Sequence, residues 1–210
     1  MGRGRGYIID IMDNNTVRKF IIVAAVALLM PLVGAAQKVA LKTNLIGDAA
    51  LSPNAAVEIG LAPKWTLDVS GQFNAWTIGD QHRWKHWVVQ PEARYWLCER
   101  FSGHFFGVHA LGGQYNVGRI GIKSLDFLGT DFSQLVDRRY QGWGAGAGIA
   151  YGYAWPVDKH WNIEAEFGFG WVYTRSDIYP CAECGTKIQE GKVHNYVGPT
   201  KVALSIVYVF

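Results

Sequence analysis

The chain has 210 residues and a formal net charge of +3, and 50% of its residues are apolar, 14% aromatic and 18% charged. This length suits one domain or at most two, and the aromatic content and low net charge exclude a disordered chain. Three cysteines cannot hold a disulfide-stapled scaffold together, and no clustered excess of Lys and Arg favours a nucleic-acid partner. High Gly and aromatic content with modest charge favours a β-rich protein with tight turns or a lipid-facing surface.

The N-terminal segment has the pattern of a secretory signal. Arg18 and Lys19 precede about a dozen apolar residues, and small residues follow up to Ala36. This run is shorter than the roughly 20 residues of a membrane-spanning helix, and the small residues form a cleavage site. We therefore predict that 1–36 is a signal peptide cleaved after Ala36 and that 37–210 is the mature domain.

The first 17 residues fit this signal poorly, because its basic region is normally brief and Asp10 and Asp13 lie within it. A start at Met12, or a non-standard start at Val17, would give an ordinary signal peptide. A genuine N-terminal extension is the alternative.

Two-residue alternation between apolar and polar side chains dominates the remainder, as a strand with two different faces requires. In the segment 65–76, for example, Trp65, Leu67 and Val69 share one face, while Thr66 and Asp68 share the other. The facing of 104–116 is not fixed by its pattern. The eight predicted strands lie at 38–46, 54–61, 65–76, 86–97, 104–116, 140–155, 161–174 and 201–210.

The connections between these strands differ in length according to the end of the sheet. Short ones lie at 62–64, 98–103 and 156–160, and longer ones near 77–85, 117–138 and 176–195; the first, 46–53, is brief. Short turns at one end and long loops at the other are typical of outer-membrane barrels. We predict an all-β fold, an eight-stranded antiparallel transmembrane up-and-down β-barrel.

A periplasmic β-sandwich or a soluble lipocalin-like barrel would alternate in the same way. A soluble sheet, however, buries its apolar face, whereas here the polar face carries packed charges and the other face carries rows of Trp, Phe and Val. Aromatic residues also collect at strand ends, as they do at membrane interfaces. They are Trp65, Tyr153, Trp155 and Trp161 beside the short turns, and Trp87, Trp143, Trp171 and Tyr173 toward the long loops.

The closing strand ends in Phe210, with Tyr208 two residues before it. This resembles the C-terminal signal that the outer-membrane assembly machinery recognises, with Ser205 at its usual small position. We therefore expect outer-membrane lipid and the barrel assembly machinery as partners.

Charged residues on the polar face would fill the lumen, because an eight-stranded barrel is just wide enough inside for side chains. We predict that they pair across the lumen as a structural plug of salt bridges, with acid–base chemistry by paired carboxylates as the alternative. The inward candidates are Lys42, Glu58, Asp68, Glu92, Arg94, Glu164, Glu166 and Lys201.

Five glycines share one face of 140–155 and predict a smooth inner wall, against which Arg94, Trp96 or Trp76 would pack. They are Gly142, Gly144, Gly146, Gly148 and Gly152.

Cys181 and Cys184 form a C-x-x-C in a long loop, and an exported protein favours a local disulfide there. A zinc half-site, which would need two more ligands, and unpaired thiols are the alternatives. The further zinc ligands near this loop would be His82, His86 and His194.

Cys98 lies in a short turn at the opposite end of the sheet from Cys181 and Cys184. We predict no cofactor.

An enzyme at the outer rim would draw on loop residues, but none of the available ones shows a diagnostic spacing. They are Asp80, His82, His86, Asp131, Ser133 and His194.

Four segments carry a family resemblance: LKTNLIGDAALSPNAAVEIGLAPKWTLDVSGQFNAW, KHWVVQPEARYWLCERFSGHFFGVHALGGQYN, YQGWGAGAGIAYGYAW and YPCAECGT with YVGPTKVALSIVYVF. They resemble the domain of unknown function 3575 family over nearly all of 38–210, most specifically from Lys85 to Asn116. The resemblance implies an exported small OmpA-like barrel of Gram-negative anaerobes with no assigned catalytic residue. Members of the family are sometimes encoded near fimbria-type surface proteins, which implies surface assembly or adhesion with such proteins as partners.

We therefore expect a non-enzymatic integral outer-membrane barrel with a structural, adhesive or surface-fibre-assembly role through its extracellular loops. The alternative is an outer-membrane enzyme acting on lipid A or peptides. A small pore is disfavoured by a filled lumen.

Overall fold

The computed structural model describes residues 38–75, 77–78, 82–118, 126–127, 130–131, 138–180 and 186–210, with side chains in 38–75, 85–118, 138–180 and 186–210. These residues belong to one compact unit, Lys38–Phe210. The predicted signal peptide, residues 1–36, lies outside the described residues.

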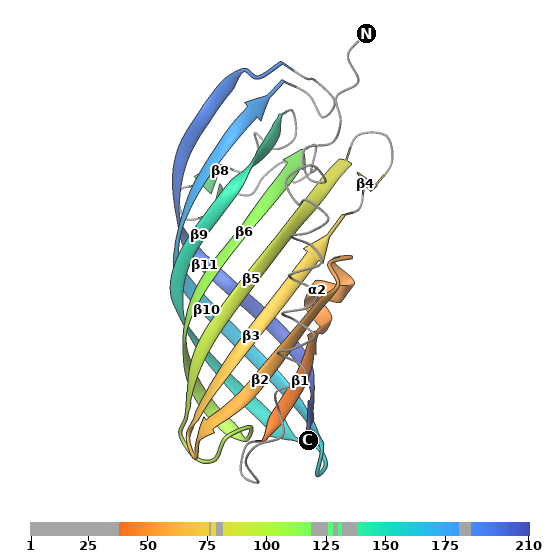
Figure 1. Ribbon diagram of the computed structural model, residues 1–210, viewed down its shortest axis with the longest axis vertical. Helices are drawn as coiled ribbons and strands as arrows, with labels where there is room; N and C mark the ends of the chain where they lie inside the picture. Colours follow the sequence, from red (N-terminus) through yellow and green to blue (C-terminus); the bar gives the residue numbers. More distant parts are fainter. Residues whose placement is uncertain are drawn as a thin grey trace, which may run out of the picture. The chain divides into compact units, whose positions relative to one another are not determined.

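Eight long β-strands form a closed ring in which every neighbouring pair is antiparallel (Figure 1). The ring follows the chain order, and it closes where the first strand pairs with the last. The predicted eight-stranded antiparallel all-β fold is thereby confirmed. The strands are β1 (Val39–Asn44), β2 (Asn54–Ala62), β3 (Trp65–Asn74), β5 (His82–Trp96), β6 (Gly103–Gly118), β9 (Arg139–Pro156), β10 (Trp161–Tyr179) and β11 (Gln189–Val209).

Among the described residues, three two-residue strands lie outside this ring. β4 (Thr77–Ile78) extends the pairing of β5, and β7 (Asp126–Phe127) pairs with β8 (Thr130–Asp131).

The two ends of the ring differ. The lower end in Figure 1 holds the C-terminus and the three short connections predicted from the sequence. The opposite, upper end is uneven, because β1 has 6 residues and β2 has 9 whereas β10 has 19 and β11 has 21. The wall formed by β9, β10 and β11 therefore rises well above the wall formed by β1 and β2.

The prediction of a long loop near 176–195 is wrong in the extent of that loop. Pairing between β10 and β11 continues upward through Thr174 with His194 and Ser176 with Lys192, and ends at Ile178 with Gln189. Apolar–polar alternation fades in this stretch because polar residues stand on both faces, so the pattern no longer marks a strand.

The connection between β1 and β2 contains α2 (Leu45–Ala49), which is preceded by the N-cap residue Asn44. The Asn44 side chain accepts a hydrogen bond from the Ile46 amide, as an N-cap does. The same side chain donates to the Val202 carbonyl and accepts from the Leu204 amide, which continues the contact with β11 beyond the last β1 pair. In the described part of the chain, no helix is long and apolar enough to cross a membrane.

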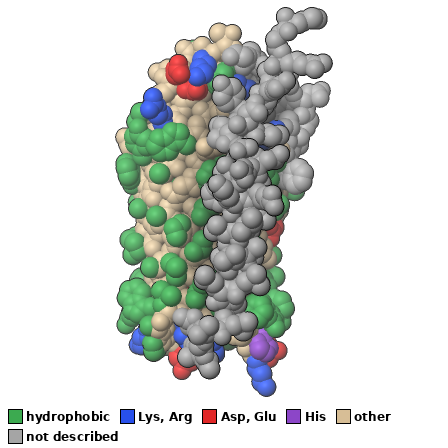
Figure 2. All heavy atoms as spheres, in the orientation of Figure 1, with side chains coloured by type: hydrophobic (Ala, Val, Ile, Leu, Met, Phe, Trp, Pro, Cys, Tyr) green, Lys and Arg blue, Asp and Glu red, His purple; other side chains and the backbone are tan. Residues whose placement is uncertain are grey.

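The inner and outer faces of the ring carry opposite kinds of side chain. Inward-pointing Arg94 is 1% exposed and Glu58 is fully buried, whereas outward-pointing Val108 and Ile149 are 64% and 67% exposed. On the face to the left of the grey atoms in Figure 2, hydrophobic side chains cover the band between the two ends, and charged side chains gather at those ends. This is the reverse of a soluble β-sandwich, which buries its apolar side chains.

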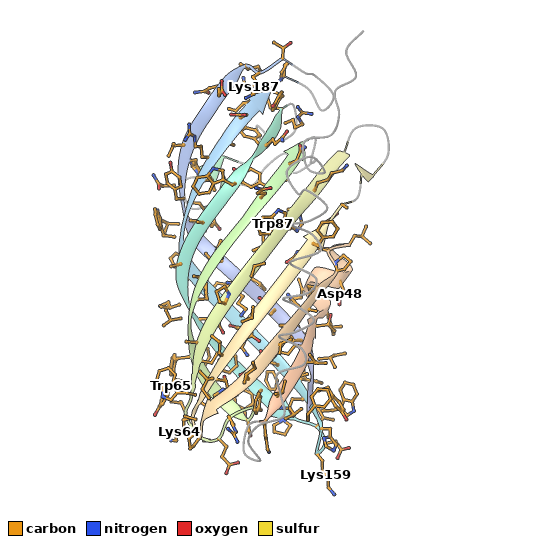
Figure 3. All side chains as sticks on the ribbon, in the orientation of Figure 1. Asp48, Lys64, Trp65, Trp87, Lys159 and Lys187 are labelled. Carbon is orange, nitrogen blue, oxygen red and sulfur yellow. The ribbon has the colours of Figure 1, made fainter. Side chains whose placement is uncertain are left out.

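The exposed tryptophan side chains lie at two levels of the outer wall. Trp65, near the lower end, has its ring centroid 5.1 Å from that of Tyr95 on the adjacent strand. At the upper level, Trp143 lies 5.7 Å from Tyr173. Trp65 and Trp87 mark the lower and upper levels in Figure 3.

Candidate functional site

The lumen holds a network of charged side chains contributed by six strands. Successive side chains of a strand point to opposite faces, so the alternation read from the sequence directs these groups inward. The structure brings together all eight residues named as inward candidates, and none of their side chains is more than 10% exposed. They are Lys42 (β1), Glu58 (β2), Asp68 (β3), Glu92 and Arg94 (β5), Glu164 and Glu166 (β10) and Lys201 (β11).

Arg94 is the centre of this lumen network. Its Nη1 donates hydrogen bonds to Glu58 and Glu164, each at 2.9 Å, and its Nη2 donates to Glu166 at 2.7 Å. Its Nε donates to Glu92 at 2.6 Å. A guanidinium carries five donors in one plane, so a single arginine can hold carboxylates from three strands together.

Two lysines complete the network on either side of Arg94. Lys42 donates to both oxygens of Glu164, at 2.9 and 3.1 Å, and also pairs with Glu58. Lys201 lies 3.0 Å from Glu92 and 3.2 Å from Glu166. The contact of Lys201 on β11 with Glu92 on β5 joins strands that lie opposite each other in the ring, so it ties opposite walls of the barrel together.

An aromatic layer lies on the lower side of the network. Trp96 and Phe105 are both fully buried, with ring centroids 4.6 Å apart. The Arg94 guanidinium stands 4.5 Å above the Phe105 ring, in cation–π range. Trp96 Nε1 donates to Thr66 Oγ1, which in turn donates to Glu58. The lower lumen is therefore filled.

His109 on β6 is a network member that the sequence analysis missed. Its Nδ1 lies 3.4 Å from a Glu92 oxygen, and its Nε2 lies 2.8 Å from Thr200 Oγ1. The facing of β6 was open because apolar residues and glycines occur on both of its faces. The usable signal was the short turn after β5, which sets the register that pairs Glu92 with His109.

Thr200, His109 and Glu92 stand in the order of a nucleophile, a base and an orienting acid. The contact between His109 and Glu92 is too long for a good hydrogen bond, and Glu92 already accepts from Arg94 and Lys201. The geometry is that of a salt-bridge network with a histidine at its edge.

The network contains five carboxyl groups, two lysines, one arginine and one histidine. Its hydrogen bonding is incomplete. Among the described residues, Asp68 Oδ1 and Glu166 Oε1 are buried without a hydrogen-bond partner. A cavity of about 140 Å³ adjoins both residues on the upper side of the network.

The glycine wall of β9 faces the lumen and accepts bulky neighbours from β6. A methyl group at Gly152 would overlap the ring of Phe105, and one at Gly148 would lie 2.6 Å from His109 Nε2. Both are direct cross-strand pairs, because β6 and β9 are adjacent in the ring. The sequence instead suggested Arg94, Trp96 or Trp76, of which Trp76 lies outside the described residues. The side chains that meet the wall at Gly148 and Gly152 include those of His109 and Phe105 on β6.

The upper hairpin of β10 and β11 is held by an ion-pair clasp. Lys187 Nζ lies 2.8 Å from an Asp177 oxygen and 3.1 Å from Glu190, and the Gly191 amide donates to Asp177 at 2.8 Å. The hydrogen bond from Lys187 lowers the pKa of Asp177 below its usual value. Lys187 stands at the upper end, opposite Lys64 and Lys159 (Figure 3).

Several predicted loop residues cannot be placed. Cys181 and Cys184 lie outside the described residues, as do Asp80, Ser133 and the side chains of His82 and Asp131. Cys98 is an exposed free thiol in a lower turn, and His86 Nε2 lies 3.2 Å from Gln72 Nε2. Within the described side chains, no three His, Cys, Asp or Glu are grouped so as to hold a metal ion.

Comparison with known proteins gives one match. The family described as "Protein of unknown function (DUF3575)" matches residues 20–210, which covers the whole ring of strands. Neither the curated proteins nor the solved structures contain a match. The match to most of the sequence shows that this chain belongs to the DUF3575 family.

Proposed function

We propose that this protein is an integral β-barrel of the bacterial outer membrane, exported by the signal peptide predicted at 1–36. The observation that carries this proposal is the reversed distribution of its side chains. Charged groups fill the lumen, while 31 large hydrophobic side chains of the described residues stand exposed. Water would penalise so large an exposed apolar surface, whereas hydrocarbon would cover it.

The dimensions of the outer wall support the same environment. Trp161 and Trp171 lie ten positions apart on β10. At about 3.3 Å per residue and a strand tilt of about 40°, they are separated by about 25 Å along the barrel axis, the height of the apolar band of such barrels. Aromatic rings prefer the two interfaces of a bilayer. The two aromatic levels therefore fit the two membrane surfaces.

We propose a structural or adhesive role, including support of surface-fibre assembly, exerted through the upper end. A lumen closed by Trp96, Phe105 and the Arg94 network is a rigid plug and offers no wide channel. The lower end has only short turns, so the upper connections supply the surface for partners outside the cell. The outward side chains of β11, including Tyr208, and the adjoining Phe210 would contact lipid and the assembly machinery.

Refolding of the purified mature chain tests the membrane assignment. In detergent micelles, we expect a folded band on unheated gels that shifts in mobility after boiling, together with insertion into phospholipid vesicles. A folded, monodisperse protein in detergent-free buffer that ignores vesicles would contradict the proposal.

Labelling of intact cells tests the orientation. We expect a membrane-impermeant amine reagent to modify Lys187 and Lys192 at the upper end and to leave Lys64 and Lys159 at the lower end unmodified until the outer membrane is permeabilised. Labelling of Lys64 and Lys159 in intact cells, with Lys187 protected, would reverse the proposed topology.

A further inference from the structure

We propose that the open edge of β11, residues 193–197, binds an extended segment of another protein by strand addition. In this mode a peptide joins a sheet through main-chain hydrogen bonds along a strand that lacks a neighbour. The inference rests on the proposed function, because the membrane assignment places this edge outside the cell. It names the part of the upper end that would hold a partner.

The upper part of β11 has a neighbouring strand on one side only. The last pair of β1 with β11 is Asn44 with Ser205, whereas β10 pairs with β11 as far as Gln189. Among the described residues, no strand pairs with β11 on the β1 side above Ser205. In Figure 1, this part of β11 forms the left margin of the tall wall. A partner strand here would continue the line of β1 along the same side of β11.

The main-chain groups on the open side belong to Val193, Asn195 and Val197. In a sheet, the N–H and C=O groups of successive residues point alternately to one side of the strand and to the other. The His194 carbonyl accepts a hydrogen bond from Thr174 Oγ1 on β10, so the odd-numbered residues around it point away from β10. Their amides and carbonyls therefore face the open side, and none of these groups is bonded to another described residue.

This open edge has a border at each end. Below it, Pro199 has no N–H, and its carbonyl accepts a hydrogen bond from the Tyr196 hydroxyl at 3.2 Å. Proline and an irregular register protect strand edges from pairing, and the register shifts here between Lys201 and Pro199. Above the edge, the Gly191 amide donates to Asp177. The residues between these borders include no proline, lysine, arginine or acidic residue.

The outward side chains of the open edge define one face of the partner. Val193 and Val197 point outward, and each is about half exposed. Val197 pairs with Trp171 of the upper tryptophan level, and Val193 lies above it on the strand. Side chains directly opposite each other on adjacent strands interact, so apolar residues of a partner would pack against these two valines.

Charge defines the upper end of the partner. The salt bridges described at the upper end join Lys187 to Asp177 and Glu190, and they leave Lys192 outside them. An acidic residue opposite Lys192 would complement its charge. Because the partner would run antiparallel to β11, this acidic residue would lie toward the C-terminal end of the bound segment.

A second copy of this chain does not fit the open edge. Both neighbours of β11 in the ring run antiparallel to it. β11 runs from the upper end to the lower end in every copy inserted with the same orientation, so two such strands could not continue this pattern. The partner is therefore an extended segment of a different protein, with outward apolar residues and an acidic C-terminal end.

The test titrates a fluorescent probe peptide, Ser-Val-Thr-Thr-Thr-Val-Glu, into the refolded mature chain in detergent micelles. In antiparallel register, its two valines face Val197 and Val193, its central threonine faces Asn195 and its glutamate faces Lys192. We expect saturable binding with a dissociation constant below about 1 mM. Hydrogen exchange should become slower at the amides of Val193, Asn195 and Val197.

Two methylated probes are the matched controls. N-methylation of the central threonine removes the donor that faces the Asn195 carbonyl, so binding should weaken by about tenfold or more. N-methylation of the next threonine changes a donor on the side of the peptide that faces away from β11, so binding should be retained.

Two variants of the barrel test the same edge. Asn195→Pro removes the central edge amide and leaves the pairing with β10 in place, so binding should weaken by about tenfold or more. Lys192→Glu should reverse the charge preference, so that a probe ending in lysine binds more tightly than the probe ending in glutamate. Both variants should retain the heat-dependent gel shift.

Absence of saturable binding, or equal binding of the two methylated probes, would overturn the proposal. Undiminished binding to folded Asn195→Pro would place the peptide elsewhere and would also overturn it. A barrel dimer that the probe dissociates would make a second copy the occupant and would refute the assigned partner. The gel shift reports on the membrane assignment and peptide binding reports on the open edge, so each can fail without the other.

Discussion

The inner and outer faces of this ring are built by the same strands, yet they follow opposite rules. On β5, Glu92 and Arg94 point inward and are almost completely buried, while Val89 and Tyr95 point outward and are exposed. The inner face is stabilised by specific partners, so its residues are not interchangeable. The outer face is mostly apolar and has few polar partners, such as the contact between His104 and Tyr151, so its main requirement is apolar character. Substitutions should therefore act differently on the two faces.

The largest effect is expected at Arg94. Replacement by Met leaves the surrounding carboxylates buried without their central cation, and loss of one partner of a buried ion pair typically costs about 3–5 kcal/mol. We expect the urea midpoint of Arg94→Met to fall sharply, or the variant to fail to fold. Arg94→Lys is the control, because it retains the positive charge but not the planar set of donors. Its urea midpoint should lie between those of the wild type and Arg94→Met. Wild-type stability in Arg94→Met would show that the network is dispensable.

A matched pair of glycine substitutions compares the two faces directly. Gly148→Ala places a methyl group 2.6 Å from both His109 Nε2 and the Phe169 carbonyl, so it should cost about 1–3 kcal/mol. Gly112→Ala points outward, where no atom lies within 4 Å, and should change the unfolding free energy by less than about 0.5 kcal/mol. Unfolding in micelles, followed by tryptophan fluorescence, measures both. Equal effects would contradict the assigned facing of β6 and β9.

Asn44→Ala tests how the wall formed by β1 and β2 is joined to β11. The change removes the α2 cap and the two side-chain hydrogen bonds to β11, so we expect a loss of about 1–2 kcal/mol. Backbone hydrogen exchange should become faster at the Leu204 amide. An unchanged exchange rate at Leu204 would show that this amide does not depend on Asn44.

The smallest effect is expected at the Asp177 clasp, which lies at the hydrated upper end. Exposed ion pairs contribute up to about 1 kcal/mol, so Asp177→Asn should change the free energy of global unfolding very little. Because the folded pKa of Asp177 is lowered, its contribution is present above the ordinary pKa of 3.8 and is lost as the pH falls through the lower folded value. Exchange protection of the Gly191 amide should follow that course in the wild type. If the protection of the Gly191 amide does not change with pH and is the same in Asp177→Asn as in the wild type, the assigned role of Asp177 is wrong.

The eight-stranded ring could be predicted from the sequence because most strands alternate strongly. Trp65 and Thr66 differ so clearly in polarity that the facing of β3 follows from them alone. On β6 the alternate residues differ little in polarity. Neither the facing of this strand nor the inward position of His109 could therefore be predicted. The upper part of β10 was missed for a related reason, since Arg175, Ser176 and Asp177 are polar on both faces.

The individual partners in the lumen could not be predicted, even where the inward direction could. Which carboxylate meets Lys42 or Lys201 depends on the stagger of strands around the closed ring, which local alternation does not contain. The larger number of acidic than basic residues on the inner face is visible in the sequence once the faces are assigned. The cavity beside Asp68 and Glu166 is not, because it depends on the packing of side chains from several strands.

The most direct test of the central claim places a charge on the outer face in a bilayer. Ile149→Lys lies midway up the wall, whereas Val193→Lys lies beside Arg175 near the upper end. In phospholipid vesicles, we expect Ile149→Lys to cost about 2–4 kcal/mol and Val193→Lys about 0–1 kcal/mol. If both variants unfold at the same urea concentration as the wild type, the outer face meets water and the membrane assignment is wrong.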